Sequence, residues 1–150
     1  MAKMVRSSKP LTAANRPGSF IKDPVGVGLR PEHHTDIPAQ KPDIGWLEIH
    51  PENYFGGGRN RYDLHENAKL YPLSFHAVGL SLGADSAVDS RHLEQIAELI
   101  EEVKPFQFSD HASWSASGNA HLNDLLPLPY TQECLDRIAA NVDSVQQRLG

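Results

Sequence analysis

Four short apolar runs constrain the fold of this chain more than any other feature of its sequence. Each run has only four or five residues and is bounded by glycine or proline, so it is too short for a helix and is typical of a buried strand. The runs are Val25–Leu29 (VGVGL), Trp46–Ile49 (WLEI), Pro72–Phe75 (PLSF) and Pro105–Phe108 (PFQF). We therefore predict four buried strands.

Segments with helical periodicity lie between and after these runs. The clearest covers 89–103, where apolar residues fall on one helix face and Asp89 or Ser90 can act as the N-cap. A second helix is predicted over 131–149, with Thr131 as its N-cap. The weaker signals are a short helix over 60–70 and a proline-rich stretch over 31–44 that permits no assignment.

The alternation of strands and helices predicts parallel βα units in an α/β fold. Four strands and about three helices correspond to half of a (β/α)₈ barrel, which typically has about 250 residues. An open doubly wound sheet is the alternative, because four strands do not show whether the sheet closes. A half-barrel leaves two unpaired strand edges, so we expect either a fragment or a homo-oligomer that forms through the open edge.

Composition excludes several classes of protein. The chain has 14 basic and 19 acidic residues, which gives a net charge of −5 and argues against a nucleic-acid partner. Its single cysteine, Cys134, excludes a disulfide framework, and no apolar run approaches the roughly 18 residues of a membrane span. Residues 1–24 hold five of the basic residues and one acidic residue, without the apolar stretch of a secretory signal. We predict a disordered basic tail over 1–24, a folded part over 25–150 and a cytoplasmic location.

Polar residues of one chemical kind follow each apolar run. In parallel βα folds the carboxyl ends of the strands meet on one face, where ligands bind and catalytic groups lie. Imidazole and carboxylate together suit iron, manganese or zinc, so the pattern predicts a metal site there. In chain order the residues are Arg30, Glu32, His33 and His34, then His50, Glu52 and Asn53, then His76, and finally Ser109, Asp110 and His111.

The strongest metal-ligand candidates occupy equivalent positions after successive strands. They are His50, His76 and one member of the Asp110–His111 pair, and strand alternation does not decide between those two. Glu48 alternates with His50 and shares its strand face, as a partner of the imidazole, a direct ligand or a paired core residue. The remaining histidines lie among polar neighbours and are interpreted as surface residues: His65, His92 and His121.

Glycine and cysteine give weaker signals. The run 56–58 (GGG) predicts a hinge or lid after the second strand, and it lacks the Lys-Ser/Thr of a phosphate-binding loop. Cys134 is interpreted as a small packed residue near the start of a helix. The sequence contains no CxxC pair, no HExxH motif and no Ser–His–Asp elbow.

Five blocks of this sequence resemble successive signatures of one bacterial family, the multinuclear non-haem iron-dependent oxidases. This family was long catalogued as uncharacterised and includes the methanobactin-biosynthesis oxidase. The resemblance covers roughly residues 25–150, in order. The blocks are GVGLRPEHH (26–34), WLEIHPENYF (46–55), LSFHAVGLSLG (73–83), FSDHASWS (108–115) and LLPLPYTQECLD (125–136).

The resemblance implies a TIM-like (β/α)₈ barrel of the xylose-isomerase and endonuclease-IV type, with two or three iron ions at its carboxyl rim. It also implies O₂-dependent modification of cysteine residues in a ribosomally made precursor peptide, which a small partner protein often presents. By matching position, His50 and His76 are expected iron ligands, and Asp110 matches the acidic position of a block in which His111 is the neighbour. Glu52 and Asn53 are expected to line the pocket.

The resemblance stops at the first four βα units, because the family's later ligand blocks are absent from this sequence. We therefore predict a truncated oxidase that is inactive alone. Arg30 is a candidate for binding the peptide backbone or a terminal carboxylate, although an ion pair with Glu32 or Glu48 explains it equally well. The alternative functions are a divalent-metal hydrolase or isomerase with the same barrel, and a non-catalytic half-barrel partner protein.

Overall fold

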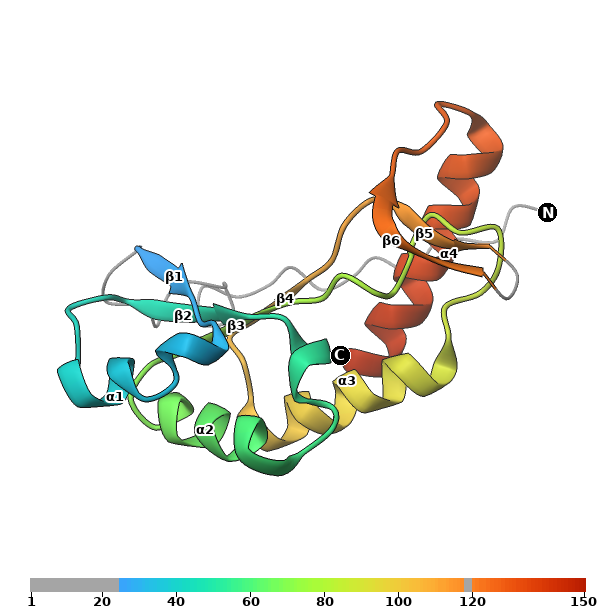
Figure 1. The fold of residues 1–150 in the computed structure, drawn as a ribbon. Coiled ribbons are helices and arrows are strands. Elements are labelled where there is room, and N and C mark those ends of the chain that lie inside the picture. The colour runs from blue at the N-terminus through green and yellow to red at the C-terminus, as the bar shows by residue number, and fades with distance from the viewer. Residues whose placement is uncertain (1–24, 118–119) are drawn as a thin grey trace, which may run out of the picture.

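The computed structural model describes residues 25–117 and 120–150, so the predicted basic tail lies outside the described residues (Figure 1). Strands and helices alternate along the first part of the chain, as the sequence predicts. The elements are β1 (Gly26–Gly28), the 3-10 helix η2 (Pro31–His33), α1 (Asp36–Gln40), β2 (Trp46–Ile49), the 3-10 helix η3 (Pro51–Tyr54), α2 (Gly58–Ala68), β3 (Leu73–His76), α3 (Ser90–Val103), β4 (Gln107–Ser109), β5 (Trp114–Ser117), β6 (Ala120–Leu126) and α4 (Gln132–Leu149).

The first four strands form one parallel sheet in the order β1-β2-β3-β4. Adjacent strands are in register, and Ile49 of β2 lies opposite Phe75 of β3, which lies opposite Phe108 of β4. Helices cross over between the strands, as parallel neighbours require. The predicted α/β fold with parallel βα units is confirmed, and closure into a (β/α)₈ barrel stays a prediction.

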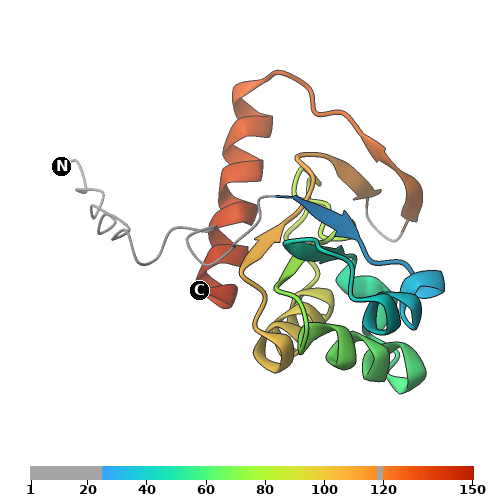
Figure 2. The ribbon, with the colours of Figure 1, turned by 90° about the vertical axis from the view of Figure 1, so that its left-hand side faces the viewer.

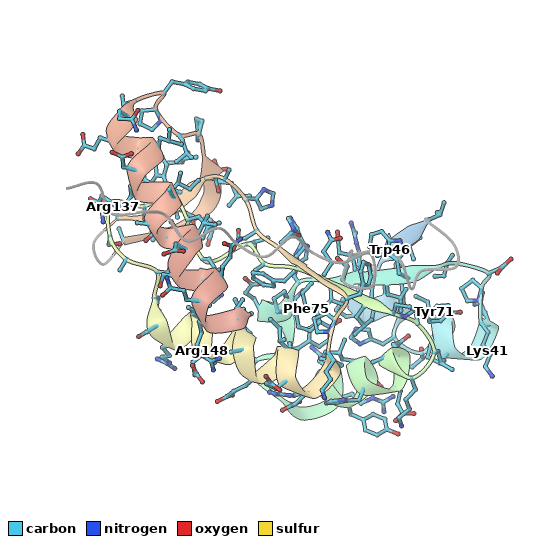
Figure 3. The ribbon with its side chains drawn as sticks, turned by 180° about the vertical axis from the view of Figure 1, so that it is seen from behind. Lys41, Trp46, Tyr71, Phe75, Arg137 and Arg148 are labelled. Atoms are coloured by element: carbon cyan, nitrogen blue, oxygen red, sulfur yellow. The ribbon has the colours of Figure 1, made fainter. Side chains whose placement is uncertain are left out.

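One face of the sheet is covered by helices and forms the main core. Leu47, Ile49 and Phe75 are at most 1% exposed, because they project from their strands toward α1, α2 and α3 on one side of the sheet (Figures 1 and 2). Phe75 lies among the side chains that fill this space (Figure 3). The runs of β2 and β3 thus form strands in which apolar side chains bury a continuous surface.

The opposite face of the same strands carries polar side chains. Glu48 of β2 lies opposite Ser74 of β3, which lies opposite Gln107 of β4. Because side chains alternate along a strand, the residues two positions further on belong to the same face. His50 and His76 therefore continue this polar face at the carboxyl ends of β2 and β3.

Gly26 in β1 is required by a close approach to the neighbouring strand. A Cβ atom at this position would lie 2.1 Å from the Trp46 ring. Only glycine at this position allows the indole to lie across β1, so packing explains Gly26.

The two longest helices have the predicted N-caps. The Asp89 carboxylate accepts a hydrogen bond from the Arg91 amide at the start of α3, and the Thr131 hydroxyl accepts one from the Cys134 amide at the start of α4. Both helices end within a residue of the predicted positions. Ile96 of α3 belongs to a second apolar cluster in which α4 takes part, and Arg148 near the end of α4 forms an ion pair with α3 (Figure 3).

A β-hairpin follows β4 and was not predicted from the sequence. It consists of β5 and β6, which pair antiparallel and lie beyond the carboxyl ends of the parallel strands (Figure 1). The hairpin is attached to the loop after β3, because the Ser81 hydroxyl accepts hydrogen bonds from the Ser115 and Ala116 amides. The Gly83 amide also donates to the Ser113 carbonyl. The hairpin is therefore anchored to the loop after β3, beyond the end of the sheet that carries the polar residues (Figure 1).

Some predicted boundaries were wrong by one or two residues. The fourth strand begins at Gln107, two residues later than predicted, since Pro105 has no amide hydrogen to donate. The proline-rich stretch 31–44 contains η2 and the short α1. Among residues 25–117 and 120–150, none of the helices combines the length and apolar character needed to cross a membrane.

Candidate metal centre

Three imidazoles meet at the carboxyl ends of β2, β3 and β4. The ring centres of His50 and His76 are 5.7 Å apart, and those of His76 and His111 are 4.6 Å apart. We call His50, His76 and His111 the imidazole cluster. The sequence-based expectation that these residues share one end of the sheet is thus met by their positions, whereas their role as ligands stays a prediction.

Hydrogen bonds fix how two of these rings present their nitrogens. His50 Nδ1 lies 2.7 Å from the His76 carbonyl oxygen, which accepts only, so Nδ1 carries the hydrogen and Nε2 keeps its lone pair. His76 Nδ1 lies 2.8 Å from the Ser109 hydroxyl, which can donate onward to the Phe75 carbonyl. Imidazoles that bind metals are commonly held in this way, by a hydrogen bond from the other ring nitrogen.

A direct contact between two rings of the cluster joins two nitrogens that can both act as ligands. His76 Nε2 and His111 Nε2 are 2.9 Å apart. Two nitrogens at about 2.1 Å from one ion, with a right angle between the bonds, lie about 3 Å apart. The spacing therefore fits either a hydrogen bond between the rings or a shared metal ion.

Burial and a neighbouring imidazole favour the neutral form of His76. Burial of the ring lowers the pKa of His76 below its usual value, and the nearby His111 lowers it further, while the charge of Glu48 opposes this. A neutral imidazole is the form that binds a metal. The effect of Glu48 on the pKa of His76 places this carboxylate near the imidazole cluster, as strand alternation predicts.

The cluster does not provide a complete metal site by itself. Within the part of the chain that the structure describes, no group of three or more histidine, cysteine, aspartate and glutamate side chains has the spacing needed to hold a metal ion. The donor chemistry fits a transition metal, because two imidazole nitrogens face each other at a spacing that one ion can share.

Asp110 is bound to backbone amides instead of to the imidazoles. One carboxylate oxygen accepts from the His111 amide, and the other lies 3.2 Å from the Leu80 amide. Burial raises the pKa of Asp110 to about 6, although these two hydrogen bonds oppose the shift. Of the pair that the sequence left undecided, His111 is therefore the residue whose side chain contacts His76.

Glu52 lies at the centre of a second polar group next to the cluster. Its Oε1 atom accepts hydrogen bonds from the Val78 amide at 2.9 Å and the Gly79 amide at 3.1 Å, and it lies 3.3 Å from His92 Nε2. Its other oxygen, Oε2, is buried and has no hydrogen-bond partner among the described residues. Burial alone would raise the pKa of Glu52, but the bonds from His92 and Val78 outweigh it and lower that pKa.

His92 was wrongly predicted to be a surface residue. Its side chain is only 19% exposed, packs edge-on against Phe55 and contacts Glu52. The missed signal is helical spacing, since His92 precedes Ile96 by four positions and so shares the buried face of α3. By contrast His65 is 40% exposed and contacts Glu102 on the surface, and the His121 side chain lies outside the described residues.

The other residues that the sequence predicted for the pocket do not take part in the contacts of the imidazole cluster described above. His34 is buried at 4% exposure, with its Nε2 2.9 Å from the Tyr54 hydroxyl, and belongs to the core beside α2. His33 is half-buried, and Asn53 and Arg30 are exposed. For Arg30 the predicted ion pair with Glu32 or Glu48 does not occur in the described ranges.

Comparison with known proteins decides the family. A profile of the RiPP precursor modification enzymes MbnB/TglH/ChrH, where RiPP denotes a ribosomally made and then modified peptide, matches residues 24–150. The chain belongs to this family. The family resemblance noted in the sequence is thereby confirmed.

Relatives with the family name UPF0276 support the assignment. The chain is 45% identical over 126 residues to a UPF0276 protein of Vibrio vulnificus strain YJ016, covering 83% of this chain and 43% of the relative. It is 47% identical over 126 residues to one of Vibrio parahaemolyticus, and 41% identical over 125 residues to one of Chromobacterium violaceum. These alignments cover 83% of this chain and 44% and 45% of the respective relatives. The chain therefore spans less than half the length of these relatives.

Proposed function

We propose that this chain forms part of an iron-dependent oxidase that modifies cysteine residues of a ribosomally made precursor peptide. Membership of a family of precursor-peptide modification enzymes supports the substrate class. One observation supports a bound metal ion: His76 Nε2 lies 2.9 Å from His111 Nε2, at the carboxyl ends of adjacent parallel strands. His50 extends this donor set from the next strand.

Each imidazole has a definable part in holding the ion. His50 and His76 use Nδ1 to hydrogen-bond a carbonyl and a hydroxyl, which orients Nε2 as the donor. His111 adds its Nε2 from the loop after β4. Bound iron would supply a Lewis acid that favours the thiolate form of a substrate cysteine, together with a site for O₂.

Access for a peptide is provided on the same side. His50 and Asn53 are exposed, so the cluster is open to solvent at this edge. Arg30 is exposed after β1, and we assign it to the backbone or terminal carboxylate of the peptide, because a guanidinium binds carboxylate with two hydrogen bonds. A small partner protein that presents the peptide belongs to the same proposal.

We further propose that the 150-residue chain is inactive alone. Two facing nitrogens are fewer ligands than a stable iron site uses, and affinity follows ligand number and order. The relatives are more than twice as long as the matched segment, which leaves room in them for further ligands. Stoichiometric multinuclear iron together with O₂-dependent peptide oxidation by this chain would contradict the proposal.

Iron binding tests the proposed site directly. The chain is loaded with Fe(II) without oxygen, desalted and analysed for iron, beside the variants His76→Ala and His111→Ala. Because the site is incomplete, we expect the wild-type chain to retain less than stoichiometric iron. Both variants should retain much less than the wild type, because each removes one of the two facing nitrogens. His65→Ala is the matched control, since that imidazole is exposed and contacts only Glu102.

Two results would contradict the assignment. Full iron content in His76→Ala would exclude His76 as a ligand. Retention of zinc or manganese with no retention of iron would favour the hydrolase or isomerase alternative, which uses the same residue types at strand ends.

A further inference from the structure

The loop between β3 and α3 directs three consecutive amides at two carboxylates. The Val78 and Gly79 amides donate to Glu52 Oε1, and the Leu80 amide donates to Asp110. Consecutive backbone N–H groups that converge in this way form a concave site for a negative charge. Here the negative charges come from the chain itself, one from the segment after β2 and one from the segment after β4.

Glu52 connects three segments that are distant in sequence. It lies in η3, two residues after His50, and its Oε1 bonds Val78, two residues after His76. The same oxygen is near His92 Nε2 of α3. The contact is tight, because a Cβ atom at Gly79 would lie 2.5 Å from the His92 ring.

We propose that Glu52 is a positioning residue that, together with His92, sets the spacing of the imidazole cluster. Its carboxylate holds the segment that follows His76 against the segment that follows His50. At the same edge, the His76 carbonyl oxygen also lies 2.7 Å from His50 Nδ1. The inference rests on the proposed metal function, and in it Glu52 acts through Oε1 as an acceptor without touching the metal.

Two readouts separate this role from others. Hydrogen exchange at the Val78 and Gly79 amides, measured by NMR on the metal-free chain, reports the hydrogen bonds themselves. The dissociation constant for Co²⁺, followed by its absorption bands, reports the spacing of the imidazoles. The first readout requires no metal and the second requires no enzymatic activity.

The variants are Glu52→Ala, which removes the acceptor, and Glu52→Gln, which keeps a side-chain oxygen at the same position. We expect Glu52→Ala to raise exchange at both amides at least tenfold and to weaken Co²⁺ binding by about 10- to 100-fold, as loss of a residue that orients a ligand does. Glu52→Gln should stay within a few-fold of the wild type in both. Glu102→Ala, which removes an exposed carboxylate bonded to Arg61 and His65, should change neither.

His92→Ala provides a second test if Glu52→Ala fails to fold. It removes one donor to the carboxylate and should produce the same changes at a smaller, several-fold size. Normal exchange and normal Co²⁺ binding in both alanine variants would overturn the proposal.

Two further outcomes separate the role of Glu52 from the proposed metal function. Normal amide protection with lost Co²⁺ binding in Glu52→Gln would overturn the proposal, because it would make Glu52 a direct ligand through its unpartnered Oε2. A wild-type chain that binds no Co²⁺ would contradict the proposed metal function. The exchange comparison would then still decide whether Glu52 holds the loop.

Discussion

His34 lies in the core with a hydrogen bond on one ring nitrogen and a carboxylate near the other. Its Nε2 is 2.9 Å from the Tyr54 hydroxyl, and its Nδ1 is 3.7 Å from Asp63. Burial raises the pKa of Tyr54 to about 12, so the hydroxyl keeps its hydrogen and can donate it to Nε2. With Tyr54 donating to Nε2, a neutral His34 carries its own hydrogen on Nδ1, toward Asp63.

This environment predicts a loss of stability in mild acid. Burial lowers the pKa of His34 in the folded chain below the ordinary value of 6.5, although Asp63 opposes the shift. As pH falls through 6.5, the unfolded chain takes up a proton that the folded chain does not, so the free energy of unfolding decreases. We expect urea unfolding at pH 7.5 and pH 5.5 to show a larger decrease for the wild type than for His34→Gln.

The comparison with the variant isolates His34 from the other titrating groups. His76 also has a lowered pKa and contributes in the same direction, whereas Asp110, with its pKa raised to about 6, contributes in the opposite direction. Both are present in each protein and cancel in the difference. Equal losses in the wild type and in His34→Gln would show that His34 is not held neutral.

At the scale of single elements, the N-cap of α3 gives a direct test of which residue begins the helix. The sequence left Asp89 and Ser90 open, and the structure shows the Asp89 carboxylate accepting from the Arg91 amide at 2.9 Å. Asp89→Ala should lower the free energy of unfolding by about 1 kcal/mol, since an amide of the first turn loses its acceptor. Urea unfolding measures the change.

The control for the cap is its neighbour. Ser90→Ala should change the free energy of unfolding by less than about 0.5 kcal/mol, because Ser90 lies within the helix and is exposed. A larger effect from Ser90→Ala than from Asp89→Ala would reverse the assignment of the cap.

Elements whose sequence carries a strong pattern were predictable, and the others were not. The β2 strand was predicted with its observed bounds, because Leu47 and Ile49 alternate with polar neighbours and turn residues flank them. The hairpin was missed because β6 (AHLNDLL) shows no clear alternation and its described side chains are mostly exposed. Its position depends on Ser81 in a distant loop, which no local pattern reveals.

The candidate site was predictable in its members but not in their contacts. His50 and His76 come together because they hold equivalent positions at the ends of parallel strands. His111 lies two residues beyond Ser109, which is the residue opposite His76. The sequence did not show that Asp110 bonds to amides or that His92 joins Glu52, since both depend on the path of the loop after β3. Contacts between loops are set by tertiary packing and carry little signal in neighbouring residues.

At the scale of the whole molecule, the parallel sheet has two outer edges. In residues 25–117 and 120–150, β1 and β4 each pair on one side only. Val27 of β1 is 42% exposed, although valine in a parallel strand is normally covered. An apolar strand with unpaired backbone groups is a template for pairing with another chain.

We therefore expect the chain to self-associate through this edge. Size-exclusion chromatography with light scattering at tens of micromolar should give a mass above that of one chain for the wild type. Val27→Lys should shift the mass toward 16.6 kDa, because a lysine on an edge strand opposes pairing. Leu70→Lys is the matched control, since Leu70 is 43% exposed and follows α2, away from the strand edges. It adds the same charge and should leave the association intact. A wild-type chain that is a monomer under these conditions, or an equal effect of both substitutions, would show that the β1 edge does not drive association.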